Sequence, residues 1–192
     1  MAIARHPKYR EIKQALETFS KKGKSFSAVC YRCTQPEFAT QLISGLGSQI
    51  HGARWTPKGS FPTVYLCESV EGALQEYLAR ARRMRLPDYR SLPMVLAGVN
   101  VKAVNLLDTT DTAVAAVIDP LLGAEKIHWR AIQNRREAVS QAIGRATKEI
   151  CFSGFIVPSQ ALPGERNIVV FPKKLKAAEF LKAPALQPLK LK

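Results

Sequence analysis

Four side chains between residues 32 and 76 have the chemistry to bind a phosphate-bearing ligand and to act on it: Arg32, Arg54, Tyr65 and Glu76. Arginine carries a permanent, forked positive charge that matches phosphate oxygens better than lysine does. An aromatic face such as that of Tyr65 can hold a planar ring flat. A carboxylate such as that of Glu76 can stabilise positive charge that develops on a neighbouring group.

Each of these residues taken singly also has an ordinary structural interpretation. Arg32 lies at the end of a predicted strand, where most arginines are surface residues. Glu76 lies well off the apolar stripe of its predicted helix, which is typical of a solvated carboxylate. Tyr65 sits in a short strand, where most tyrosines are packing residues, and Ser159 follows a proline, where a turn residue is ordinary. No single one of them therefore identifies a site.

The elements that position these residues are predicted from hydrophobic periodicity and from turn residues. Strand patterns cover residues 26–32, 63–67, 92–99, 152–157 and 167–171, and helical patterns cover residues 9–19, 36–46, 70–81, 112–118 and 134–150. Strands and helices interleave without a regular βαβ rhythm, and this predicts an α+β fold.

Turns and loops are expected between these elements. Ser69 is expected to cap the helix that carries Glu76. Glycine and proline crowd between residues 45 and 62, which predicts a loop that carries Arg54 and Trp55. A turn is expected at residues 105–111, a loop at Pro120 and Gly123, and a single helical turn at residues 177–181.

Length and composition indicate a single globular domain of ordinary size. The chain has 192 residues, 46% of them hydrophobic, which is enough for a sizeable core. No stretch approaches the roughly 18 uncharged apolar residues of a membrane span. The N-terminus lacks the apolar region of a signal peptide, so a cytoplasmic protein is expected.

The formal net charge of +14 is concentrated at the two ends of the chain. Residues 1–25 carry seven lysines or arginines against two glutamates, and residues 173–192 carry six lysines against one glutamate. The long segment between them is therefore only modestly basic. Charge of this kind favours anionic ligands and non-specific association, and it says nothing about the fold.

The four cysteines do not predict a metal or redox centre. Cys30 and Cys33 form one C-x-x-C pair, but a zinc site needs a second pair or suitably spaced histidines. The pair brackets Tyr31 and Arg32 in a predicted strand, so the two thiols are expected on opposite faces. Buried, reduced cysteines are the favoured interpretation.

The order of several short motifs resembles the RES domain family, which is named for an arginine, a glutamate and a serine. The motifs are Cys30-Tyr31-Arg32, Gly52-Ala53-Arg54-Trp55, Val64-Tyr65-Leu66, Ala73-Leu74-Gln75-Glu76 and Val157-Pro158-Ser159, with Asn167 following. Gln141-Ala142-Ile143-Gly144 resembles the family's late-helix signature. The resemblance covers about residues 28–172, although Thr56 stands where family loops often carry asparagine.

The resemblance implies a fold and a chemistry. RES domains are toxin halves of bacterial toxin–antitoxin pairs with an ADP-ribosyltransferase-like fold, a split mixed or antiparallel sheet flanked by helices. NAD would be the substrate and its nicotinamide–ribose bond the bond cleaved, with no metal involved. Water, phosphate and a protein side chain all remain open as the acceptor of ADP-ribose.

The resemblance also implies roles for individual residues. Arg32 and Arg54 would contact NAD and its phosphates, Tyr65 would stack on nicotinamide, and Glu76 and Ser159 would complete the catalytic set. The wider NAD-binding set would add residues beside these in the motifs: Tyr31, Trp55, Gln141 and Asn167. The expected partner is an antitoxin of the helix-turn-helix (Xre) type that covers the NAD cleft.

This interpretation divides the chain into three parts. Residues 1–25 would form a basic helical extension, residues 26–172 the RES-like catalytic domain, and residues 173–192 a lysine-rich tail. The alternative is a basic nucleic-acid-binding module without catalytic activity. That alternative accounts for the net charge but for none of the motifs, so nucleic-acid binding is expected to be weak and non-specific if it occurs.

Overall fold

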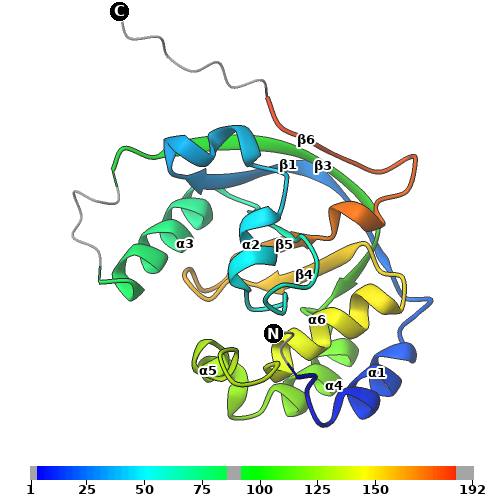
Figure 1. Cartoon of the computed structure of the whole chain (residues 1–192). Helices are drawn as coiled ribbons and strands as arrows, with labels where there is room; N and C mark the ends of the chain where they lie inside the picture. Colours follow the sequence, from blue (N-terminus) through cyan, green and yellow to red (C-terminus); the bar gives the residue numbers. More distant parts are fainter. Residues whose placement is uncertain (1–3, 86–91, 185–192) are drawn as a thin grey trace, which may run out of the picture.

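In the computed structural model, which describes residues 4–85 and 92–184, the strands form one mixed sheet (Figure 1). The strands are β1 (Lys24–Thr34), β2 (Val64–Cys67), β3 (Val95–Asp108), β4 (Gly154–Pro158), β5 (Arg166–Val170) and β6 (Phe180–Lys182). Their order is β1-β2-β5-β4-β3-β6, and β1 also pairs with β3, so the first five strands close into a ring. β4 runs parallel to β3, and the other pairs are antiparallel.

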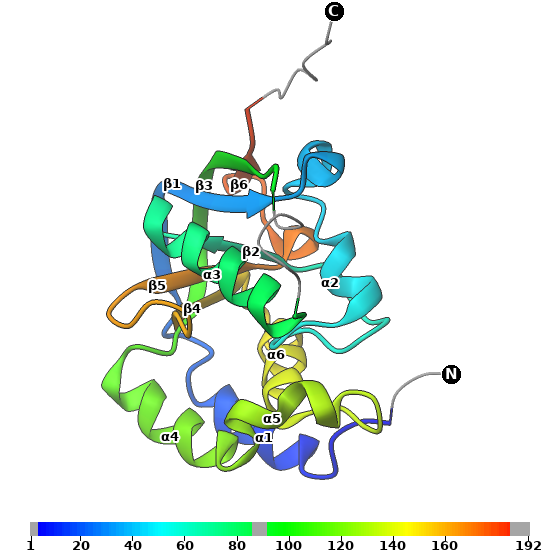
Figure 2. The ribbon, with the colours of Figure 1, turned by 90° about the vertical axis from the view of Figure 1, so that its left-hand side faces the viewer.

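The helices lie on two sides of this sheet. They are α1 (Tyr9–Glu17), α2 (Leu46–His51), α3 (Val70–Arg83), α4 (Thr112–Leu122), α5 (Glu125–Ile132) and α6 (Val139–Glu149). Helix α3 packs on β1 and β2, whereas α1, α4, α5 and α6 gather at the other end of the molecule (Figures 1 and 2). The predicted α+β class is confirmed. No helix in residues 4–85 or 92–184 is long and apolar enough to cross a bilayer.

The larger core lies between the sheet and the helices α1, α4 and α6. Helix α1 presents buried residues at helical spacing, namely Tyr9, Ile12 and Leu16. They join the same cluster as Phe155 of β4 and Val169 of β5. The helix of the basic N-terminal segment is therefore part of the domain core.

A second core lies on the opposite face of the strands. Alternation along the strands places one residue in two on this side. Its buried members come from all five strands of the ring: Cys30, Val64, Leu66, Val99, Val101, Ala103, Leu106, Ile156, Ile168 and Val170. Together the two cores fix the strands whose ends carry the candidate site.

Several predicted elements agree with the structure in position and type. The Ser69 hydroxyl accepts a hydrogen bond from the Gly72 N–H at 2.9 Å, so the predicted cap of α3 is confirmed. Cys30 is buried and Cys33 half-buried, but Cys151 is exposed, which corrects the expectation that the thiols are buried. The predicted tail is described as far as residue 184, and residues 185–192 lie outside the described residues.

Other predictions were wrong in extent. Strand β3 continues to Asp108, so most of the turn expected at 105–111 is strand. Helix α4 continues through Pro120 to Leu122, so the proline that was expected in a loop lies inside the last turn of the helix. Helix α2 interrupts the loop expected between residues 45 and 62, and α5 was not predicted.

The start of α6 and the C-terminal segment also differ from the prediction. Helix α6 begins at Val139 and not near residue 134, because Ala138 is extended and the fully buried Glu137 carboxylate is held by Arg145 at 2.7 Å. Residues 180–182 form strand β6 where a helical turn was expected. They gain backbone partners on β3, with Val101 opposite Leu181.

Candidate functional site

A cavity of about 820 Å³ opens where the ends of β1, β2, β4 and β5 face α3, α5 and the loop before β2. It brings together eight of the predicted site residues: Tyr31, Arg32, Arg54, Trp55, Tyr65, Glu76, Ser159 and Asn167. Segments far apart in the sequence thus supply one surface. We call it the central cavity.

Glu76 is the carboxylate at the centre of a hydrogen-bonded set. Its Oε1 accepts from the Ser159 hydroxyl at 2.8 Å and from the Asn167 side-chain amide at 2.8 Å. The three residues come from α3, the loop after β4, and β5. Both bonds end on Oε1, so Oε2 keeps its capacity to accept from a bound group.

Ser159 and Asn167 are themselves held in place. The Ser159 Oγ accepts from the backbone N–H groups of Ala161 and Leu162, both at 3.2 Å. Asn167 lies in β5 opposite Val157 and Cys67. Its Oδ1 is buried and has no hydrogen-bond partner within the described chain, which leaves an acceptor in the cavity wall.

Arg54 lies at the tip of a tight turn. The backbones of Ala53 and Thr56 bond to each other in both directions, at 2.9 and 3.1 Å. The Arg54 Cζ lies 5.3 Å from the Trp55 ring centroid. Its Nε and Nη1 are buried and find no partner among residues 4–85 and 92–184, and burial lowers the pKa of the guanidinium. Since a buried cation without acceptors is costly, this geometry favours an anionic ligand.

Tyr65 connects the strand β2 to the turn that carries Arg54. Its hydroxyl accepts from the Trp55 backbone N–H at 3.1 Å and shares a hydrogen bond with Thr56 Oγ1 at 3.0 Å. Burial raises the pKa of Tyr65 to about 12, so the phenol is neutral. The ring is part of the cavity wall, and the hydroxyl positions the turn.

Gln141 does not line the cavity and instead holds the Arg54 turn from α6. Its Nε2 donates to the backbone oxygens of Ala53 at 3.1 Å and Thr56 at 3.3 Å. A Cβ on Gly144, one turn further along α6, would lie 1.8 Å from the Trp55 carbonyl oxygen. The late-helix signature therefore allows α6 and this turn to pack closely.

Trp55 and Arg32 also have structural partners. The Trp55 ring is only 4% exposed and packs 5.1 Å from the Phe155 ring centroid, so most of it belongs to the core. The Arg32 Nη1 donates to the Leu42 carbonyl oxygen at 2.7 Å. Burial, followed by the charge of Arg80, lowers the pKa of Arg32.

Further cavity residues escaped the sequence prediction. Arg80 and Arg83 lie in the basic last turn of α3, and both line the central cavity. Trp129 and Arg130 enter the cavity from α5, with the Arg130 Cζ 4.3 Å from the Trp129 ring centroid. In the sequence, Arg80 and Arg83 are linked only by their spacing of three residues, which places them on one face of a helix.

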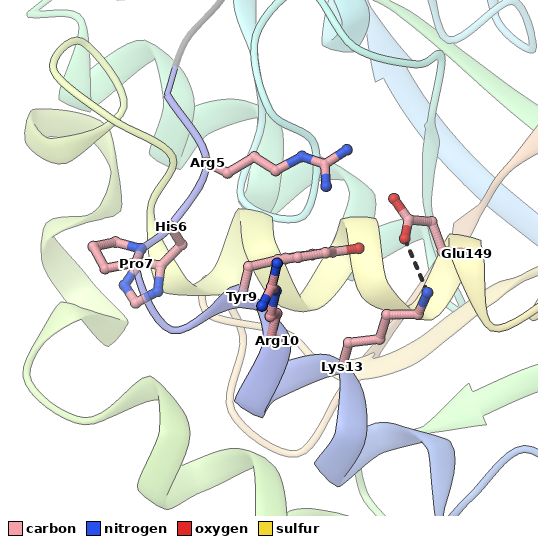
Figure 3. Close-up of a pocket in the computed structure, with 7 residues that line it drawn as sticks. All are labelled: Arg5, His6, Pro7, Tyr9, Arg10, Lys13 and Glu149. Carbon is pink, nitrogen blue, oxygen red and sulfur yellow. Dashed lines mark ion pairs between the residues drawn. The ribbon is translucent and has the colours of Figure 1, made fainter.

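A second hollow of about 610 Å³ lies beside α1 and the end of α6 (Figure 3). It is lined by Arg5, His6, Pro7, Tyr9, Arg10, Lys13 and Glu149. The Lys13 Nζ lies 3.3 Å from a Glu149 carboxylate oxygen, so the acid of this hollow is paired. It contains none of the predicted site residues. We call it the N-terminal groove.

The titratable residues of the described chain include no group of three or more His, Cys, Asp or Glu side chains that could hold a metal ion. The central cavity instead combines five arginines with two carboxylates, Glu76 and Asp119. Its chemistry is that of an anion-binding site with one positioned carboxylate.

Comparison with known proteins gives a family match and a structural match. A family model described as the RES domain matches residues 29–191. The fold is similar to that in the M. tuberculosis MbcT–MbcA toxin–antitoxin complex, with a TM-score of 0.64 and 20% sequence identity over 90% of each chain. No curated protein matches the sequence. At this identity the structural match establishes a shared fold.

Proposed function

The chain belongs to the RES domain family, and we propose that it is a toxin that binds NAD in the central cavity and cleaves the nicotinamide–ribose bond. One observation carries this proposal. A carboxylate held by two hydrogen bonds, Glu76, lies in the same cavity as an arginine with buried, unpartnered nitrogens, Arg54. An anionic dinucleotide requires a cation that binds its phosphates, and its cleavage requires a carboxylate that stabilises the positive charge on the ribose.

Arg54 and Arg32 are proposed to hold the pyrophosphate of NAD. Phosphate oxygens would satisfy the Arg54 Nε and Nη1, which have no acceptor in the described chain. Arg32 already gives one nitrogen to the Leu42 carbonyl, so its remaining N–H groups would serve the ligand. The face of Tyr65 would support the nicotinamide ring.

Glu76 is proposed to act on the reacting ribose. When the bond from ribose C1′ to the nicotinamide nitrogen breaks, the electron pair leaves with the base and positive charge develops on the sugar. The carboxylate stabilises that charge, and its hydrogen bonds from Ser159 and Asn167 keep it in place. The free Oδ1 of Asn167 would accept from a ribose hydroxyl.

The ADP-ribosyl group would then pass to water, phosphate or a protein side chain, as in an ADP-ribosyltransferase-like enzyme. Purified protein would be incubated with NAD alone, with added phosphate, and with cell lysate. The products expected from the three acceptors are free ADP-ribose, phosphorylated ADP-ribose and labelled protein. Absence of nicotinamide release under all three conditions would exclude the enzymatic proposal.

We also propose a cytoplasmic toxin that is neutralised by an antitoxin of the helix-turn-helix (Xre) type. The similar fold is that of a toxin–antitoxin complex. The five arginines of the cavity would suit an acidic inserting segment of the partner. Expression of the chain alone should stop growth, and co-expression of the neighbouring gene should restore it. Unimpaired growth with active protein would argue for a different role.

A further inference from the structure

We propose that Glu137 is a positioning residue for the NAD site, and that it acts through Gln141 on the turn that carries Arg54. This inference rests on the proposed function for the role of Arg54. It makes the N-terminal segment at Ala4 and His6 part of the support of the central cavity, although both residues precede those that the RES family model matches.

Glu137 is fixed by hydrogen bonds to both its side chain and its backbone. The residue is fully buried, its Oε1 accepts from Arg145 Nε at 2.7 Å, and its Oε2 accepts from the His6 backbone N–H at 3.1 Å. Its own N–H donates to the Ala4 carbonyl oxygen at 2.9 Å, and its carbonyl oxygen accepts from Arg136 Nη1 at 3.1 Å. The main chain immediately before α6 is therefore held in one place.

The next peptide bond transmits this constraint to Gln141. The N–H of Ala138, which follows Glu137, donates to Gln141 Oε1 at 3.1 Å. Since the oxygen and nitrogen of a side-chain amide lie in one rigid plane, a fixed Oε1 sets the direction of Nε2. Nε2 donates to the backbone oxygens of Ala53 at 3.1 Å and Thr56 at 3.3 Å. A shift of the peptide between residues 137 and 138 would therefore misdirect the donor that holds this turn.

Glu125 holds the same segment from α5. Its Oε2 accepts from the N–H of Val139, the first residue of α6, at 3.0 Å. Gln133, which follows α5, lines the central cavity and accepts from Gln141 Nε2 at 2.9 Å. The segment before α6 thus fixes the end of α5 and the Arg54 turn together.

The contacts of Glu137 predict an effect on ligand binding beyond any effect on stability. A buried ion pair contributes little net stability, because the cost of desolvation offsets the attraction between the charges. Its hydrogen bonds have defined directions, however, and these directions reach the Arg54 turn through Gln141. In the proposed function Arg54 contacts phosphate and not the reacting ribose. Its misplacement should therefore raise the KM for NAD more than it lowers kcat.

Glu137→Gln tests this role with two measurements. The KM for NAD should rise by about three- to tenfold while kcat stays within about twofold. Amide hydrogen exchange of residues 53–56, which needs no ligand, should become faster than the global loss of stability accounts for. Arg145→Lys keeps the positive charge and removes the Nε contact, so it should act in the same direction with a smaller effect. It serves as the test if Glu137→Gln does not fold.

The matched control is Glu179→Gln. Glu179 is a buried carboxylate that accepts from the N–H groups of Val104 and Lys176, both at 2.7 Å, and from the Ser153 hydroxyl at 3.0 Å. It does not line the central cavity. Glu179→Gln should lower the Tm, but it should leave the KM for NAD and the local exchange of residues 53–56 unchanged.

A double-mutant cycle then tests whether Glu137 acts through Gln141. Gln141→Leu removes the donor of the turn, so adding Glu137→Gln should raise the KM no further than about twofold. Two residues that act independently would instead multiply their effects.

Three results would overturn the positioning role of Glu137. The first is an unchanged KM and unchanged exchange of residues 53–56 in folded Glu137→Gln or Arg145→Lys. The second is an equal change in Glu179→Gln, which would assign the effect to general loss of stability. The third is multiplied effects in the double variant. If exchange of residues 53–56 becomes faster in Glu137→Gln but the wild-type protein neither binds nor cleaves NAD, the proposed function fails and the positioning of the turn stands.

Discussion

The central cavity and the N-terminal groove are both lined by cations, but they differ in where those cations come from. The groove draws Arg5, Arg10 and Lys13 from α1 and the segment before it, and the only acid in its lining, Glu149, pairs with Lys13. The cavity draws its side chains from β1, α2, β2, α3, α4, α5, β4, β5 and the loops before β2 and after β4. Most of the groove lining follows from α1 and the segment before it, whereas the cavity lining requires most of the fold.

The two regions also differ in the charge of the buried atoms that lack a partner. In the cavity, Arg54 Nε and Nη1 and Asn167 Oδ1 are buried without partners in the described chain. In the groove, the buried Tyr9 hydroxyl also lacks a hydrogen-bond partner in the described chain, and burial followed by Glu149 raises the pKa of Tyr9. Positive charge and an unpartnered hydroxyl therefore do not distinguish a ligand site. The buried cationic nitrogens of Arg54 without an acceptor distinguish the cavity.

The largest expected effect is the difference between removing the carboxylate of the cavity, Glu76, and removing that of the groove, Glu149. Glu76→Gln keeps the size of the side chain and removes its charge, so NAD cleavage should fall on the order of 10²–10³-fold with the fold intact. Glu149→Gln in the groove should leave the rate near that of the wild type. Nicotinamide release in single-turnover assays measures both.

A matched control for Glu76 lies on the same helix. Glu71 is exposed, and its Oε1 accepts only from Gln75 in the described chain, at 2.7 Å. Glu71→Gln should therefore change the rate little. Full NAD consumption by Glu76→Gln would show that the residue assignment is wrong, even with the family assignment unchanged.

The second prediction concerns an arginine in each region. Arg54→Met should weaken NAD binding by about tenfold or more, because it removes charged hydrogen bonds to phosphate. The same change should leave the free protein as stable as the wild type or raise its Tm by about 2–4 °C, since it removes buried nitrogens that have no acceptor. Calorimetric titration and thermal melts measure the two effects.

Arg10→Met provides the comparison for Arg54→Met. Arg10 is exposed in the groove, so neither NAD affinity nor Tm should change appreciably. A large loss of stability on Arg54→Met would mean that Arg54 supports the fold and would remove the main argument for an anion at that point.

The third prediction tests the support behind the Arg54 turn. Gln141→Leu removes the side-chain donor of the Ala53 and Thr56 carbonyls, which then keep only the backbone hydrogen bonds between the two residues. The free energy of unfolding should fall by about 1–3 kcal/mol, and the KM for NAD should rise more than kcat falls. Denaturant unfolding and steady-state kinetics provide the two measurements.

Ser140 is the matched control for Gln141 on the same helix. Its hydroxyl is buried and has no hydrogen-bond partner in the described chain. Ser140→Ala should thus be neutral or slightly stabilising, because it removes an unsatisfied polar atom. If both variants behave alike, the hydrogen bonds of Gln141 do not hold the turn.

The sequence predicted the residues of the cavity that lie on elements with a strong pattern. Arg32, Tyr65 and Asn167 lie in strands, and Glu76 lies on a helix with a clear cap, so each was placed by alternation or helical period. The resemblance to one family then joined them into a single site. In the structure these four residues line one cavity.

The residues that escaped prediction depend on contacts between elements. Arg80 and Arg83 lie off the apolar stripe of α3, and nothing in the sequence places α5 opposite them. Strand β6 is three residues long and exists because β3 offers a free edge. Gln141 bonds to Ala53, which is 88 positions away in the sequence. Local patterns carry no information on such pairings.

The smallest expected effect concerns stability at the N-terminal groove. His6 is 8% exposed, and burial lowers its pKa below the ordinary value of 6.5, although the nearby Glu125 and Glu137 oppose this. The His6 imidazole therefore binds a proton more readily in the unfolded chain than in the folded chain. Stability from this residue is present above pH 6.5 and is lost as the pH falls below that value.

His6→Asn should reduce this dependence on pH. Asparagine can still accept from the Lys8 N–H, as His6 Nδ1 does at 3.2 Å, but it cannot take up a proton. The fall in Tm between pH 7.5 and pH 5 should become shallower by on the order of a degree or two. NAD consumption should not change, because His6 lies in the groove and not in the central cavity. The exposed His128 is the control, and a similar change in slope on His128→Asn would show that the burial of His6 is not the cause.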